Sequence, residues 1–174
     1  MSGLIKELLK RYKCYRDPIS YYRSLGAVIG ERCEIRGGVN FGSEPYLIKI
    51  GNHVRINAGV QLITHDGGAW VLREYADVKN RENLTLFNMI EIGNNVHIGS
   101  DALIMPGVTV GDNCIIGCNA VVTKSIPSNS IAVGVPARVI ETIDEYYEKH
   151  KEDFSFTKNM TKEEKKEYLL KTMK

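Results

Sequence analysis

Aliphatic residues recur every six positions between Ile92 and Pro127, in six consecutive hexapeptides without an insertion. The first position of each hexapeptide is aliphatic, and the fifth is small or aliphatic. The inward residues are therefore spaced alternately by four and two, which fits neither an α-helix of period 3.6 nor a long strand of period two. The spacing predicts a short strand followed by a corner, with inward residues at Ile92, Val96, Ile98, Ala102, Ile104, Val108, Val110, Cys114, Ile116, Ala120, Val122 and Ile126.

Turn-forming residues occupy the positions between the inward ones. Gly stands at the second position in four of the six repeats, and Asn or Asp stands at the third or fourth in most of them. Since these residue types tolerate a positive φ, we expect both sets to bend the chain at the corners. Each hexapeptide is therefore predicted to form one side of a coil.

Weaker repeats of the same kind precede this stretch. The interval from Phe41 to Ile50 is nine residues, which predicts a three-residue bulge or a small loop. The repeat fails between His65 and Met89, where Trp70, the only tryptophan, and its apolar neighbours are too hydrophobic for a disordered segment. We expect residues 66–89 to leave the coil as a long loop that packs on another surface. The inward residues of the weaker repeats are Ile29, Ile35, Phe41, Ile50, Ile56 and Leu62.

Helical patterns flank the repeat, so we divide the chain into a helical segment at residues 1–26, a coil at 27–140 and C-terminal helices at 141–174. Leu4–Tyr15 carries apolar residues at helical spacing. We expect the flanking helices to cover the open ends of the coil, whose strand edges would otherwise pair further.

Helix-start signals support this division at two places. Asp17 followed by Pro18 is typical of a capped helix start. Beyond the coil, residues 142–150 form one helical pattern, and Thr161 with Glu164 gives a capping-box pattern that opens another.

Composition narrows the class of protein. The chain has 174 residues with a net charge of +2, which argues against a dedicated nucleic-acid binder. No apolar run has the length of a bilayer span, and the basic N-terminal helix lacks the uninterrupted core of a signal peptide, so we expect a cytoplasmic protein. A helix of this kind resting on a membrane surface is the alternative. The four cysteines have no metal-binding spacing and indicate no disulfide framework.

The hexapeptides, together with LITHDGG at residues 62–68 and VVTKSIPSNSIAVGVPARVI at residues 121–140, resemble a known family. It comprises the hexapeptide-repeat, acetyl-CoA-dependent O-acetyltransferases of galactosides, maltose, capsular polysaccharides and streptogramin-type drugs. The resemblance implies a left-handed parallel β-helix of three hexapeptides per turn, with N- and C-terminal helices and one long extruded loop. It also implies a homotrimer with active sites between neighbouring coils, acetyl-CoA as donor and no metal.

The resemblance also suggests roles for single residues. His65, at the head of the loop, matches the general base of the family, and a neutral imidazole suits the removal of a proton from a sugar hydroxyl. Asn40 matches an acceptor-binding residue, and we expect Trp70 to contact the acceptor as well. The family often has Trp where His97 stands and a second basic residue where Glu141 stands. The residues that match coenzyme A contacts are Ser100, Cys118, Thr123, Lys124 and Arg138.

Several functions stay open at this point. The acceptor expected first is a hydroxyl of a sugar or polysaccharide precursor, and the alternatives are an antibiotic hydroxyl of streptogramin or chloramphenicol type and the amino group of an amino sugar. A zinc carbonic anhydrase of the same fold class is a remote alternative. The zinc sites of such enzymes include two histidines five residues apart, and His53, His65 and His97 contain no such pair. A non-catalytic β-helix scaffold is another, although it would need neither His65 nor a Trp-bearing loop.

Overall fold

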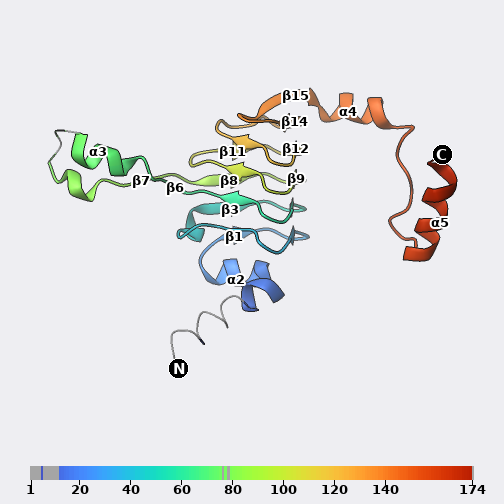
Figure 1. Cartoon of the computed structure of the whole chain (residues 1–174), viewed down its shortest axis with the longest axis horizontal. Coiled ribbons are helices and arrows are strands. Elements are labelled where there is room, and N and C mark those ends of the chain that lie inside the picture. The colour runs from blue at the N-terminus through green and yellow to red at the C-terminus, as the bar shows by residue number, and fades with distance from the viewer. Residues whose placement is uncertain (1–4, 6–11, 76, 78, 174) are drawn as a thin grey trace. The chain divides into compact units, whose positions relative to one another are not determined.

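The computed structural model describes residues 5, 12–75, 77 and 79–173. The chain divides into two compact units, Met1–Ile143 and Asp144–Lys174, and each is described by itself. In the first unit, short strands stack one above another (Figure 1). They form three sheets with the strand orders β1-β3-β8-β11, β13-β10-β5 and β15-β14-β12-β9-β4-β2, which we name the first, second and third sheets.

All pairs in the three sheets are parallel except β14 with β15, which is antiparallel. The first sheet comprises β1 (Val28–Ile29), β3 (Ile48–Ile50), β8 (Ile90–Ile92) and β11 (Thr109–Val110). The second comprises β5 (Gln61–Leu62), β10 (Leu103–Ile104) and β13 (Val121–Val122). The third comprises β2 (Glu34–Ile35), β4 (Arg55–Ile56), β9 (Val96–Ile98), β12 (Cys114–Ile116), β14 (Ser130–Val133) and β15 (Arg138–Thr142).

The register between neighbouring strands gives the length of one turn. Asn95 and Asn113, which hydrogen-bond on adjacent turns, are 18 residues apart. A turn therefore holds one strand from each sheet, which agrees with the three hexapeptides per turn that the family resemblance implies. Glu31 and Asn52 are 21 residues apart, because the 3₁₀ helix η1 (Pro45–Leu47) lies in the interval that the sequence marked as too long.

The predicted inward residues form the core. None of the twelve in the regular repeats exposes more than 5% of its surface, and none of the six upstream exposes more than 8%. These values confirm the register that we predicted from the sequence. Full burial of a Val, Leu or Ile side chain stabilises the fold by about 1.5–3 kcal/mol. A one-residue shift of the strand register would expose such side chains and destabilise every turn.

The corners confirm one expectation and correct another. Asn95, Asp101, Asn113 and Asn119, all at the fourth position, have φ of 54°, 59°, 55° and 56°. The glycines at the second position were expected to have positive φ as well, and this was wrong, because none of them does. A Cβ on Gly99 would lie 2.5 Å from the backbone nitrogen of Cys118, so close approach of the next turn is what requires glycine there.

The helix α2 (Pro18–Ser24) packs under the first turn of the coil. The Asp17 side chain accepts a hydrogen bond from the backbone N–H of Ser20, with Pro18 in the first turn, as the sequence predicted. The helix predicted at Leu4–Tyr15 lies mostly outside the described residues, and residues 12–16 are helical.

The C-terminal elements are α4 (Ile143–His150), which begins at the boundary between the units, and α5 (Lys162–Thr172). The predicted capping box is confirmed, because Thr161 Oγ1 accepts a hydrogen bond from the Glu164 N–H and the Glu164 carboxylate accepts one from the Thr161 N–H. No helix within the described part of the chain has the length and apolar character needed to cross a membrane.

Candidate active site

An arm, which we define as residues 65–87, leaves the coil after the second-sheet strand β5 (Figure 1). Its neck is a two-stranded antiparallel ribbon of β6 (His65–Asp66) and β7 (Leu86–Phe87), in which His65 lies opposite Phe87. The N–H of Asn88 donates to the carbonyl of Thr64 at 2.9 Å and closes the base of the neck. Residues 42 positions apart, such as Asn52 and Asn94, therefore meet on adjacent turns.

The arm carries the helix α3 (Ala69–Tyr75) and the 3₁₀ helix η2 (Arg81–Asn83). The Asp66 carboxylate accepts a hydrogen bond from the N–H of Gly68 at 2.7 Å, which turns the chain into α3. The Arg73 guanidinium donates twice to the Leu84 carbonyl, at 3.0 and 2.8 Å, and holds the helix to the returning chain. The sequence analysis missed α3, although its Ala, Leu, Arg and Glu residues favour a helix.

A pocket of about 230 Å³ lies between α3 and the neck of the arm. His65, Trp70 and Phe87 line it, together with Asp66 and Arg73. The His65 side chain is 48% exposed, and its ring centroid lies 6.1 Å from that of Phe87. The structure thus brings two of the residues singled out from the sequence, His65 and Trp70, to the same pocket.

A carboxylate lies beside His65. Glu44 Oε2 is 3.3 Å from His65 Nδ1, and the Glu44 side chain is only 14% exposed. The same oxygen accepts a hydrogen bond at 2.9 Å from the hydroxyl of Thr64, which is fully buried. Hydrogen bonds from Ser43, Thr64 and His65 lower the pKa of Glu44 despite the opposing effect of burial, so the group is ionised at neutral pH.

The sequence analysis did not single out Glu44. The residue lies in the nine-residue interval between Phe41 and Ile50, directly before η1, and Leu47 N–H donates to its carbonyl. The interval was predicted as a bulge or small loop, but the contact between Glu44 and His65 depends on how adjacent turns stack. A usable signal was the position of this insertion, about one coil turn before the head of the loop.

Asn40 lies on the turn below β5. Its backbone carbonyl accepts a hydrogen bond from Leu62 N–H at 2.8 Å, and its side-chain oxygen accepts one from Gly42 N–H at 2.9 Å. The side chain therefore shapes its own loop, and Asn40 is not among the described residues that line the pocket with His65.

The residues that match coenzyme A contacts lie at both ends of the second-sheet strands. Ser100 and Cys118 precede β10 and β13, and the N–H of Asn119 donates to the carbonyl of Ser100 at 2.9 Å. Thr123 and Lys124 follow β13, at the same edge of the sheet as the chain leading to His65.

Arg138 begins β15, immediately after Ala137, whose N–H donates to the carbonyl of Val121 at 2.8 Å. Arg138 therefore lies next to the last strand of the second sheet, and its side chain, like those of Thr123 and Lys124, is exposed. Cys118 is a free, exposed thiol. The structure thus places Thr123, Lys124 and Arg138 on the last turn of the coil.

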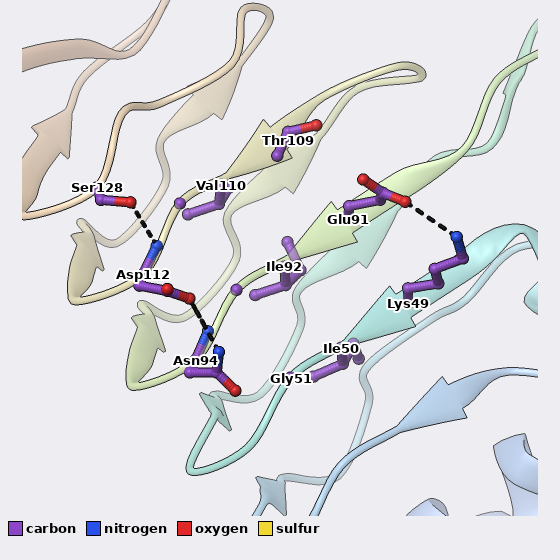
Figure 2. Close-up of a pocket in the computed structure, with 12 residues that line it drawn as sticks. Lys49, Ile50, Gly51, Glu91, Ile92, Asn94, Thr109, Val110, Asp112 and Ser128 are labelled. Atoms are coloured by element: carbon purple, nitrogen blue, oxygen red, sulfur yellow. Dashed lines mark hydrogen bonds and ion pairs between the residues drawn. The ribbon is translucent and has the colours of Figure 1, made fainter.

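A larger pocket of about 430 Å³ lies along the first sheet, away from His65 (Figure 2). Figure 2 shows Lys49 and Glu91 pointing toward each other, with Nζ and Oε1 3.1 Å apart. The Asp112 carboxylate accepts hydrogen bonds from Asn94, and Ser128 Oγ accepts one from Asp112 N–H. The polar groups of this pocket pair with one another and hold successive turns together, so they have a structural role. We therefore place the candidate active site at His65 rather than in this pocket.

His53 and His97, the other histidines of the coil, lie apart from His65. His53 Nδ1 is 2.8 Å from the side-chain oxygen of Asn95 at a corner, and His97 lies on β9 beside Arg55 and Ile115. Over the residues that the structure describes, no three His, Cys, Asp or Glu side chains gather in a way that would hold a metal ion.

Comparison with known proteins places this architecture in a family. Residues 89–124 match the family model described as bacterial transferase hexapeptide (six repeats). Protein CapG of Staphylococcus aureus is 44% identical over 177 residues, which cover 100% of this chain and 97% of CapG. Galactoside O-acetyltransferase of Escherichia coli K12 is 44% identical over 103 residues, which cover 59% of this chain and 47% of that enzyme.

A solved structure extends the similarity to the fold. The maltose O-acetyltransferase from Clostridium difficile 630 superposes with a TM-score of 0.57 at 28% sequence identity, covering 81% of this chain and 89% of that one. This likeness implies that the coil is the left-handed parallel β-helix of such enzymes. The chain therefore belongs to the hexapeptide-repeat acetyltransferase family and is an acyltransferase.

Proposed function

We propose that this acyltransferase moves an acetyl group from acetyl-CoA to a hydroxyl of a sugar or polysaccharide precursor, with His65 as general base. The observation that carries the proposal is the position of the half-exposed imidazole in a pocket that Trp70 and Phe87 also line. Pockets for small molecules combine apolar and aromatic walls with a few polar groups, and this pocket has that composition. The names of the galactoside and maltose O-acetyltransferases support a saccharide acceptor.

The chemistry requires a base at this place. A sugar hydroxyl is a weak nucleophile at neutral pH, so its proton must leave as the oxygen attacks the carbonyl carbon of the thioester. His65 accepts that proton, the bond between carbonyl carbon and sulfur then breaks, and the imidazolium returns the proton to the departing thiolate. The products are an acetyl ester and a free thiol, and no covalent intermediate with the protein is needed.

The coenzyme is proposed to lie along the second sheet. Lys124 and Arg138, both exposed on the last turn, supply positive charge for phosphate groups. Ser100, Cys118 and Thr123 flank the same strands and offer small side chains for close contact. His65 and Lys124 end up on the same edge of the sheet, two turns apart, which corresponds to about 10 Å along the coil.

We also propose that the active form is a homotrimer in which the arm packs against a neighbouring copy. On α3, Trp70, Val71 and Tyr75 are 74%, 65% and 84% exposed, which is unusual for three large side chains of one short helix on a monomer. Light scattering on the purified protein tests this, and a monomer that retains full activity would overturn it.

The test of the catalytic proposal is the His65→Asn variant, which keeps polarity but removes the titratable base. We expect kcat to fall by about 10²–10⁴, the range for general acid–base catalysis, with the affinity for acetyl-CoA unchanged. His150→Asn, in the second unit, serves as the matched control and should retain wild-type activity. If His65→Asn keeps more than about a tenth of kcat, the assignment of His65 is wrong.

The acceptor is tested by following thiol release with a panel of compounds. Galactosides, maltose and capsular sugar precursors represent the proposed class, while chloramphenicol, a streptogramin and glucosamine represent the antibiotic and amino-sugar alternatives. Turnover of a saccharide hydroxyl with kcat/KM well above that of the other compounds supports the proposal. Preferential acetylation of the drugs or of the glucosamine amine would replace it.

A further inference from the structure

We propose that Glu44 is a positioning residue for His65: its carboxylate accepts the Nδ1–H of the imidazole, so that Nε2 is left unprotonated to act as the base. This inference rests on the proposed role of His65. It adds a second residue to the site, one that nothing in the hexapeptide pattern marks as functional.

The first support is the contact itself. Glu44 Oε2 lies 3.3 Å from His65 Nδ1, so the ring atom nearest the carboxylate is Nδ1. A neutral imidazole carries one proton, and a carboxylate accepts but does not donate a hydrogen bond when it is ionised. The contact therefore selects the tautomer with the proton on Nδ1.

The second support is the way in which Glu44 is held. The Thr64 hydroxyl donates to Glu44 Oε2 at 2.9 Å. Thr64 directly precedes His65 in the chain and is fully buried. The carboxylate thus contacts both Thr64, at the base of the neck, and His65, the first residue of the neck. Because its side chain is only 14% exposed, little water competes for the same oxygen.

The third support is the origin of Glu44 in the chain. The regular coil has a period of 18 residues per turn, and the turn containing Glu44 is longer, since Glu31 and Asn52 are 21 residues apart. The extra residues form η1 (Pro45–Leu47) immediately after Glu44. The insertion that interrupts the repeat therefore delivers a carboxylate to the base of the arm.

Other charged groups near His65 have different partners. The Asp66 carboxylate binds the N–H of Gly68, and the Arg73 guanidinium binds the carbonyl of Leu84. Both residues line the pocket, but the ion-pair contact to the His65 ring is made by Glu44. Removing the Glu44 carboxylate should consequently change the tautomer of His65 more than removing that of Asp66.

The kinetic test uses Glu44→Gln, which keeps size but replaces the carboxylate with an amide that is able to donate to Nδ1. We expect kcat to fall about tenfold or more with little change in the acceptor KM, because part of the population holds the wrong tautomer. Thr64→Val, which removes the hydroxyl that anchors the carboxylate, should give a smaller loss in the same parameter. A rise in acceptor KM with unchanged kcat would instead make Glu44 an acceptor-binding residue and overturn the proposal.

The second readout is independent of activity. ¹⁵N-detected NMR of the full chain reports the tautomer of each histidine. We expect the neutral imidazole of wild-type His65 to carry its proton on Nδ1, and Glu44→Gln to raise the fraction of the Nε2–H tautomer. Asp153→Asn is the matched control, since His150 Nδ1 and Asp153 Oδ2 are 3.2 Å apart, and it should change His150 alone.

The two proposals fail in different ways. If His65→Asn is inactive while Glu44→Gln has wild-type kcat and His65 spectra, His65 remains the base and the role of Glu44 is wrong. If His65→Asn keeps its activity, the catalytic roles of both residues are wrong, whatever the spectra of Glu44→Gln show.

Discussion

The phenol ring of Tyr22 stacks on the ring of Phe41, with the centroids 3.8 Å apart and the planes within 8° of each other. The Tyr22 hydroxyl donates a hydrogen bond at 2.9 Å to the carbonyl of Val39. Burial, reinforced by the nearby Cys14 thiol, raises the pKa of Tyr22, so the phenol stays protonated and remains a donor. One residue of α2 thereby joins the helix to the first turn of the coil.

Tyr22→Ala is expected to destabilise the protein because it opens a cavity over Phe41, a side chain with no exposed surface. The free energy of unfolding should fall by about 3–5 kcal/mol, and Tyr22→Phe should lose only about 1 kcal/mol with the hydrogen bond. Urea denaturation measures both. Phe156→Ala, which removes a ring that is 95% exposed, is the control and should leave the midpoint unchanged. Equal midpoints for Tyr22→Ala and the control would contradict this role of α2.

The coil could be predicted from the sequence because its core residues recur with the short hexapeptide period. Ile98 and Ile116 are paired on adjacent turns of the third sheet, as the hexapeptide register requires, and both are fully buried. Each inward position makes the same contact as the position one turn before it. A repeated pattern of this kind needs no knowledge of the rest of the chain.

The candidate site was only partly predictable for the opposite reason. His65 stood out because it occurs where the repeat fails, but Glu44 reaches it from another turn through an insertion whose path the period does not specify. The corner glycines illustrate the same limit, since Gly99 is required by its distance to Cys118 rather than by its own backbone dihedral angles. Contacts between turns determine both features, and these contacts cannot be inferred from the sequence of a single hexapeptide.

His97 leads to a prediction about the pH dependence of stability. Burial, and then the charge of Arg55, lower the pKa of His97 below its ordinary value of 6.5. The folded state therefore binds a proton less readily than the unfolded state, so this contribution to stability is fully present above about pH 6.5 and is lost as the pH falls through the lowered pKa. The free energy of unfolding should decrease less steeply with acidification in His97→Asn than in the wild type.

Chemical denaturation at a series of pH values between about 7 and 5 measures this difference, and subtraction of the two curves removes the contributions of the other titrating groups. The charge of Arg55 is one cause of the lowered His97 pKa, so Arg55→Gln removes that cause while leaving the imidazole in place. It also removes the pairing of Arg55 with Glu34, which are 3.5 Å apart. This second variant should show an intermediate slope. Parallel curves for the wild type and His97→Asn would show that His97 titrates alike in both states.

Lys124→Ala and Arg138→Ala should each weaken the binding of acetyl-CoA. If each side chain makes a charge-assisted contact with a phosphate, the loss is about 1–2 kcal/mol, or about a 5- to 30-fold rise in KM, with kcat unchanged because both residues are proposed to bind phosphates rather than the reacting atoms.

Isothermal calorimetry with acetyl-CoA tests this expectation without the acceptor. Lys158→Ala, which removes an exposed lysine of the second unit, controls for the loss of net positive charge. Because Ala137 binds Val121 on the last turn, Arg138 and Lys124 lie at the same end of the coil, and their effects should couple in the double variant. The difference from wild type should shrink at high salt, since screening weakens exposed charge contacts. Identical affinities of wild type and both single variants would move the phosphate site away from this end of the coil.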